Sequence, residues 1–178
     1  GMLHERDYPA LFATTQADWA PIDLRFVPLT GAADDRLVAR VYVVPFVGDA
    51  CVVVGFDHGD WGPAGGGLEP GETVRAALER ELREEAGARL RSYTPFAVLR
   101  CHSRGAPYRA HLPHPDYDCL YGYGDVELAG PPDAADGGER IMAVEVMAPE
   151  QAVAFLTRQG RPWEADLYRL ATRLRRSV

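Results

Sequence analysis

Two kinds of hydrophobic pattern alternate along the chain. Near-continuous β-branched runs at 36–47 and 50–56 predict adjacent strands that are covered on both faces. Looser alternation predicts further strands, and Pro28 places the first of them at a sheet edge. These strands are expected at 22–29, 89–101, 117–128 and 139–147. Apolar residues at helical spacing predict three helices, at about 72–86, 149–158 and 162–176.

Segments rich in glycine, proline or polar residues separate these elements. Residues 57–71 and 129–138 are expected to be irregular, and the proline-punctuated segment 103–116 is typical of a loop that forms a pocket wall or lid. Residues 2–20 lack a clear period and are expected to pack on the domain as an N-terminal arm or short helix. The order of elements predicts an α/β fold over residues 2–178, a mixed sheet with helices on both sides in one domain, ending in the 162–176 helix.

Composition narrows the class of protein. The chain has 178 residues, 47% hydrophobic and 25% charged, as in an ordinary globular protein. Its net charge of −7, with no basic run, argues against binding a nucleic-acid polymer. Three cysteines without CxxC spacing suit free thiols in a reducing cytoplasm. No membrane span or secretory signal is expected, and Gly1 before Met2 is typical of a residue left from recombinant expression.

The expected helix at 72–86 carries an unusual set of acidic residues. On a helical wheel, Leu78 and Leu82 belong to a core-facing stripe, whereas Glu81, Glu84 and Glu85 lie beside that stripe and not opposite it. Carboxylates at the border of a core repel one another and lose hydration unless a cation neutralises them. Oxygen ligands suit Mg²⁺ or Mn²⁺. The alternative is an acidic face paired with arginines of the same helix.

The residues before the helix make the pattern more specific. Gly65, Gly66 and Gly67 allow the backbone to pass close to a ligand, and Glu72 lies near the start of the helix. The whole segment resembles the Nudix box, written G, five residues, E, seven residues, R-E-U-x-E-E-x-G-U, where U is a bulky aliphatic residue. The residues that match in register are Gly66, Glu72, Arg80, Glu81, Leu82, Glu84, Glu85 and Gly87. Ala88 is smaller than the last position expects.

The resemblance implies a Nudix-like α/β/α sandwich and a metal-dependent hydrolase of a diphosphate linkage in a nucleoside diphosphate derivative or related small molecule. Mg²⁺ or Mn²⁺ would be the cofactor, and Arg80 would orient a glutamate. The residues that the resemblance places at the metal are Glu81, Glu84, Glu85, the Gly65 carbonyl and Glu72. The general base is either a glutamate of the box or one outside it, for which Glu139 is the candidate. A Nudix-fold binding or regulatory module without hydrolysis is the alternative function.

Substrate choice lies outside the box, where the sequence is less informative. Trp61 and Tyr108 are candidates for stacking on a base, and Arg100 is a candidate for pairing with phosphate. Aromatic residues at 117, 121 and 123 share one strand face, where core packing is the competing interpretation. His111 and His114 lack the spacing and partners of a zinc site. The substrate and the oligomeric state stay open, with a homodimer as one option.

Overall fold

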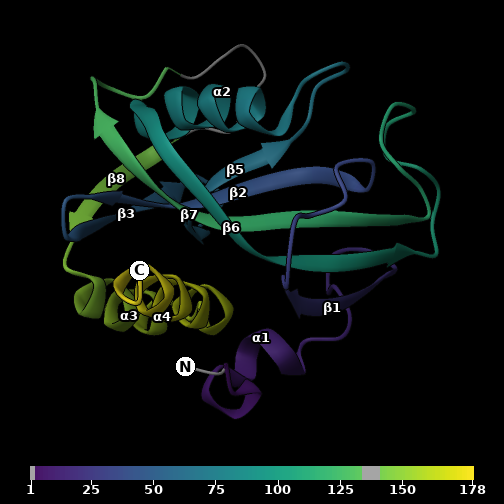
Figure 1. Cartoon of the computed structure of the whole chain (residues 1–178), viewed down its shortest axis with the longest axis horizontal. Coiled ribbons are helices and arrows are strands. Elements are labelled where there is room, and N and C mark those ends of the chain that lie inside the picture. Colours follow the sequence, from purple (N-terminus) through teal and green to yellow (C-terminus); the bar gives the residue numbers. More distant parts are fainter. Residues whose placement is uncertain (1–2, 134–140) are drawn as a thin grey trace.

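The computed structural model describes residues 3–133 and 141–178, which form one mixed sheet of eight strands with helices on both faces. Figure 1 shows α2 on one face of the sheet and α3 with α4 on the other, as the sequence predicted. The helices are α1 Pro9–Ala13, α2 Val74–Ala86, α3 Pro149–Arg158 and α4 Pro162–Arg176. The strands are β1 Ile22–Pro28, β2 Val38–Val47, β3 Ala50–Phe56, β4 Trp61–Gly62, β5 Ala64–Gly67, β6 Ala88–Ser103, β7 Asp116–Leu128 and β8 Ile141–Met147.

Strand β2 is the centre of the sheet. It runs parallel to β7 on one side, and on the other it pairs antiparallel with β3 and β5. Its side chains are mostly buried on both faces, which confirms the interpretation of the β-branched runs. The edge position predicted for the first strand is also confirmed, because β1 lies at the end of the strand order, where it pairs with β6.

The expectation of irregular structure throughout 57–71 is wrong. Residues 61–62 and 64–67 form the short strands β4 and β5. Glycine permits this pairing because β5 lies tightly against β2, with Gly65 opposite Tyr42. Gly65 has φ +156°, and a Cβ there would lie 2.5 Å from the Tyr42 ring. At Gly65 the short strand therefore approaches β2 at a distance that only a residue without a side chain allows.

Both ends of α2 follow the rules of helix capping. Thr73 is the N-cap, and its side chain accepts a hydrogen bond of 3.1 Å from the Ala76 amide. Gly87 ends the helix in the left-handed region with φ +63°, as the sequence predicted. Strand β6 begins at the next residue, so the helix is held directly against the sheet at its C-terminal end.

Substituting Gly87 by alanine should lower the free energy of unfolding by about 2–4 kcal/mol, because left-handed strain combines with a steric clash. A Cβ at Gly87 would overlap the carbonyl oxygen of Gly130. Gly160 is the matched control, since it also has positive φ, +72°, but nothing lies within 4 Å of its Cβ position. Urea unfolding should show a much smaller loss for Gly160→Ala, and equal losses would remove the clash from the explanation.

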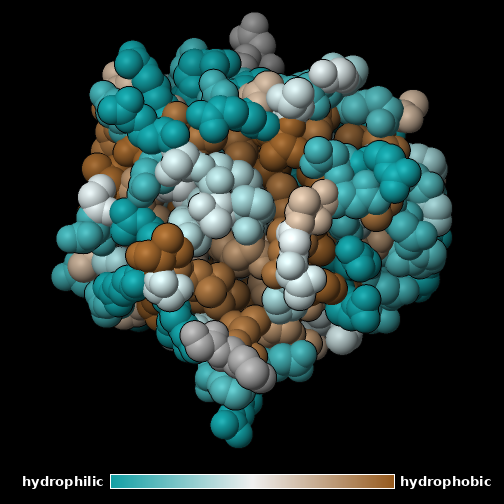
Figure 2. All heavy atoms as spheres, viewed as in Figure 1, coloured by the Kyte–Doolittle hydropathy of each residue, from teal (hydrophilic) through white to brown (hydrophobic). Residues whose placement is uncertain are grey.

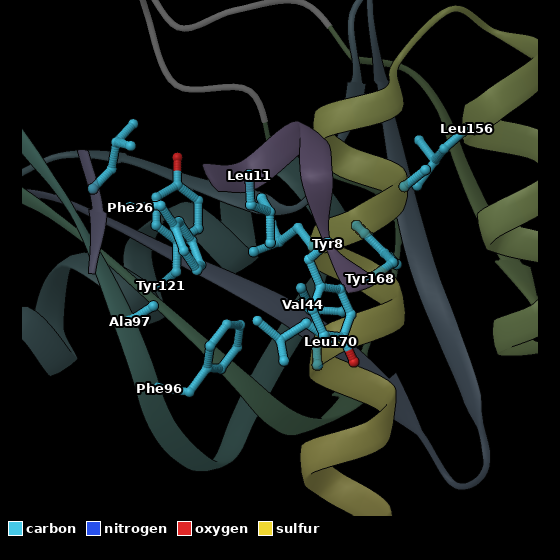
Figure 3. Packing of buried hydrophobic residues seen from close by; sticks show 14 of the residues in the cluster. Tyr8, Leu11, Phe26, Val44, Phe96, Ala97, Tyr121, Leu156, Tyr168 and Leu170 are labelled. Carbon is cyan, nitrogen blue, oxygen red and sulfur yellow. The ribbon is translucent and has the colours of Figure 1, made fainter. Parts of the chain in front are cut away.

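The sheet carries a hydrophobic core on each face. One core lies under α2, and the other lies between the sheet, α3, α4 and the N-terminal arm. Figure 3 shows Tyr8 and Leu11 of the arm beside Val44 of β2 and Leu170 of α4. The prediction that the arm packs on the domain is thus confirmed. In Figure 2, hydrophobic side chains reach the surface in the middle of the displayed face and are ringed by hydrophilic ones.

None of the helices within the described residues has the length and apolar character needed to cross a membrane.

Candidate active site

Helix α2 has the orientation that the helical wheel predicted. Leu78 and Leu82 are fully buried, whereas Glu79 on the far side is exposed. Glu81 and Glu85 are each only 8% exposed, although both are acidic. Glu84 is partly exposed between them. The carboxylates therefore border the core, where each needs a hydrogen-bond partner or a cation.

Arg80 supplies part of that compensation. Its guanidinium donates to both oxygens of Glu72, at 2.8 and 2.9 Å, and to Glu81 at 2.9 Å. The Nη2 of Arg80 also donates to the Gly67 carbonyl oxygen at 3.0 Å. Its Nη1 lies 3.5 Å from Glu84 Oε2. The hydrogen bond from Arg80 lowers the pKa of the Glu72 carboxyl. Arg80 thus ties the start of the helix, the glycine-rich strand and two of the glutamates together.

The glycines of β5 make room for the glutamates. The Gly65 amide donates a 2.8 Å hydrogen bond to Glu85 Oε1. A Cβ on Gly66 would lie 2.5 Å from Glu81 Oε1, so no other residue fits there without moving the carboxylate. Burial raises the pKa of Glu81, although Arg80 acts in the opposite direction, and the nearby Glu84 raises it further. The close approach of β5 to α2 explains why the box needs glycine at these positions.

The donor set on this side of α2 fits a hard divalent cation. Its side-chain donors are carboxylate oxygens, at a place where burial penalises their negative charge. Among the residues that the structure describes, no three acidic, histidine or cysteine side chains converge on one point. Arg80 draws Glu81 toward itself while Glu85 is turned to the Gly65 amide, so like charges are kept apart. The residues that could hold the ion are Glu81, Glu84 and Glu85.

One of the three glutamates, Glu85, lines a cavity of about 730 Å³. Glu85 and Gly65 line one part of it, and Trp61, Trp163 and Glu164 line another. A second cavity of about 850 Å³ lies between the arm, the sheet and the 103–116 loop. The two cavities share six lining residues, namely Trp19, Leu24, Arg40, Tyr42, Leu99 and Tyr121. The two cavities are therefore adjacent, and the 103–116 loop forms a wall of the second one.

The structure places the other candidate residues differently. Trp61 lines the first cavity and packs edge-on against Phe155, and Tyr108 lines the second cavity. Arg100 instead pairs with the buried Asp118 at 3.2 Å and lies on the opposite face of β6 from the cavity residue Leu99. Glu139, the candidate base outside the box, lies outside the described residues.

Aromatic residues of β7 belong mainly to the core. Tyr121 is buried and Tyr117 and Tyr123 pack on the same cluster, which confirms their common face. His111 and His114 contact different backbone carbonyls, of Leu68 and Gly105. This arrangement agrees with a polar loop and not with a zinc site. The contact of His111 with Leu68 also connects the 103–116 loop to the segment that precedes α2.

Sequence reasoning missed two charged features of the cavities. Arg40 lies near the start of β2 and lines both cavities. An arginine inside the β-branched run 36–47 was the signal for it. Glu164 of α4 lines the first cavity and accepts a 2.8 Å hydrogen bond from Arg161, which also pairs with Asp60. Burial raises the pKa of Glu164. No spacing in the sequence connects α4 to the box.

Comparisons with known proteins agree with this geometry. The family model described as NUDIX domain matches residues 36–171. Nucleoside triphosphatase NudI of Enterobacter sp. (strain 638) is 37% identical over 75 residues, which cover 38% of this chain and 53% of that protein. The protein of the same name from Salmonella paratyphi B is 29% identical over 102 residues, 49% of this chain and 72% of that protein. The chain thus spans about half the length of the Enterobacter relative.

The fold is also found among solved structures. The Bacillus subtilis pyrophosphohydrolase BsRppH superimposes with a TM-score of 0.52 at 15% identity, covering 71% of this chain and 73% of that chain. At this identity the likeness concerns the fold. Together with the family match over most of the sequence, it confirms the resemblance carried by residues 66–88. The chain belongs to the Nudix family.

Proposed function

We propose that the protein is a metal-dependent pyrophosphohydrolase that cleaves a phosphoanhydride bond in a nucleoside diphosphate or triphosphate, or in a derivative of one. The observation that carries the proposal is the set of box glutamates beside the core, of which Glu85 lines a cavity large enough for a nucleotide. The names of the NudI relatives support a nucleotide substrate. A non-catalytic binding module is the alternative, and the presence of every box carboxylate favours hydrolysis.

The chain's own residues have separate tasks in this proposal. Glu81, Glu84, Glu85 and the Gly65 carbonyl hold the cation, which when bound neutralises the diphosphate and lowers the pKa of a water. Arg80 positions Glu81 through the 2.9 Å hydrogen bond, and Glu72 fixes Arg80 from the other side. A carboxylate of the box or Glu139 accepts the proton of the attacking water. Trp61 and Tyr108 form cavity walls for the rest of the substrate.

A panel of nucleoside diphosphates, triphosphates and their derivatives tests the reaction class. With Mg²⁺ or Mn²⁺ present, at least one member should release phosphate or pyrophosphate, measured with a coupled phosphatase where needed. Chelation should stop the release, and restoring the cation should recover it. If the folded protein binds a member of the panel but turns over none with either cation, the binding-module alternative is correct.

Cation binding can be measured without turnover. Mg²⁺ or Mn²⁺ should raise the thermal midpoint of the protein, since a ligand at 100 times its Kd stabilises the folded state by about 2.7 kcal/mol. Glu84→Gln should reduce this shift strongly. Glu79→Gln is the matched control, because Glu79 lies on the exposed side of the same helix and pairs with Arg75. Equal shifts in both variants would place the cation elsewhere.

A further inference from the structure

Arg40 is a partly buried positive charge that lines both cavities. Its Nε donates a 2.7 Å hydrogen bond to the Tyr42 hydroxyl. The pKa of Arg40 is raised, with Tyr42 as the largest cause, and Cys119 and Tyr121 contribute. The charge of Arg40 also acts on Glu81, whose pKa it lowers. A partly desolvated guanidinium gains from a ligand that supplies further negative charge and accepts its remaining hydrogen bonds.

The donors of Arg40 suggest which ligand this is. A guanidinium has five N–H donors in a plane, and Tyr42 accepts from only one of its nitrogens. Because Arg40 lines both cavities, an anion in either one can reach it. A phosphate matches the planar arrangement of donors and can accept two of them at once. The position between the box and the second cavity suits a phosphate next to the anhydride that is cleaved.

The second cavity differs in character from the first. Its lining is largely apolar and includes Leu24, Ala39 and Leu99. Two aromatic residues that line it are unusually exposed, Trp19 at 74% and Tyr108 at 78%. Trp19 comes from the arm and Tyr108 from the 103–116 loop, and neither is part of a buried core cluster. Exposed aromatic faces beside an apolar floor suit the stacking of a nucleobase.

We propose that Arg40 binds a phosphate of the substrate and that Trp19 and Tyr108 contact its nucleobase in the second cavity. This inference rests on the proposed function. It assigns the residues by which the active site would bind a nucleotide more tightly than a polyphosphate without a base. Arg40 determines affinity for the phosphate part of any ligand. Trp19 determines affinity only where an aromatic group is attached.

Intrinsic fluorescence can test this directly, because all three tryptophans of the sequence, Trp19, Trp61 and Trp163, line the first cavity. The probes are a methylene-bridged nucleoside triphosphate analogue, which cannot be hydrolysed at the bridge, and inorganic tripolyphosphate, both with Mg²⁺. Arg40→Met should raise the Kd for both probes about 10- to 100-fold, the worth of a charge-assisted hydrogen bond. Trp19→Ala should raise the Kd for the nucleotide analogue and leave that for tripolyphosphate unchanged.

Two controls separate binding from structure. Arg36→Gln removes an exposed arginine just before β2, and both Kd values should stay at the wild-type level. Arg40→Met should not lower the thermal midpoint, because it replaces a partly buried charge with an apolar side chain of similar length. A large fall in that midpoint would identify Arg40 as a structural residue and overturn its assignment. An unchanged Kd for tripolyphosphate in Arg40→Met would do the same.

The contact between Trp19 and the nucleobase would be contradicted if Trp19→Ala raised the Kd for both probes by the same factor. If the protein does not hydrolyse nucleotides, the measurements differ from those that would contradict the Arg40 or Trp19 assignment. In that case the wild type binds the analogue and loses affinity in Arg40→Met, yet it turns over no nucleotide. The binding measurements therefore judge Arg40 and Trp19 whether or not the protein is a hydrolase.

Discussion

Glu85→Gln should reduce Mg²⁺-dependent turnover by roughly a thousandfold, about 4 kcal/mol of transition-state stabilisation, while the protein stays folded. The substitution removes the negative charge that we propose holds the cation. The amide oxygen of glutamine can still accept the 2.8 Å hydrogen bond from the Gly65 amide, so the contact between β5 and α2 is kept. Glu84→Gln should have a similar effect. The measurement is kcat on the best substrate of the panel at saturating cation.

Glu79→Gln again separates the site from the helix as a whole. It changes charge by the same amount on the same helix, but Glu79 faces solvent and pairs with Arg75. Its kcat should stay within about twofold of the wild type, as expected for a substitution away from the site. If Glu84→Gln or Glu85→Gln retained full activity, the assignment of these carboxylates to the cation would be wrong.

The part of this site that could be predicted is the part encoded locally. The position of Glu81 and Glu85 beside the core follows from the spacing of Leu78 and Leu82, since all four residues lie on one rigid helix. Gly87 ended that helix where the sequence indicated, because its backbone preference is intrinsic. Within one helix, the pattern of residues determines the geometry almost completely.

The cavities depend instead on contacts between distant segments. Arg40 lies next to the box only because β5 folds back against β2. The high glycine content of β5 predicted irregular structure, so the pairing of β5 with β2 could not be predicted from the sequence. Trp19 from the arm and Tyr108 from a loop meet at the same cavity although 89 positions separate them in the numbering. Glu164 reaches the first cavity from the last helix. Such proximity is a property of the tertiary packing, which single-sequence periodicity does not report.

Arg80→Met should lower the free energy of unfolding by about 3 kcal/mol, or roughly 6–12 °C in thermal midpoint for a protein of this size. The Arg80 side chain is only 19% exposed, and it pairs with the side chains of Glu72, which is 14% exposed, and Glu81, which is 11% exposed. Removing it leaves these carboxylates beside the core without their main donor, which costs more than the pair itself contributes. Thermal and urea unfolding without divalent cation measure the loss, and Arg83→Met on the exposed side is the control.

Combining Arg80→Met with Glu72→Gln distinguishes a charge network from simple packing. If the loss in Arg80→Met comes from the uncompensated carboxylate of Glu72, then removing that charge as well should restore part of the stability. The double variant should therefore be destabilised by less than the sum of the two single variants, by about 1 kcal/mol or more. Strict additivity would show that the two hydrogen bonds between Arg80 and Glu72 contribute no coupling energy, and that Arg80 stabilises the site mainly by its contacts with Gly67 and Glu81.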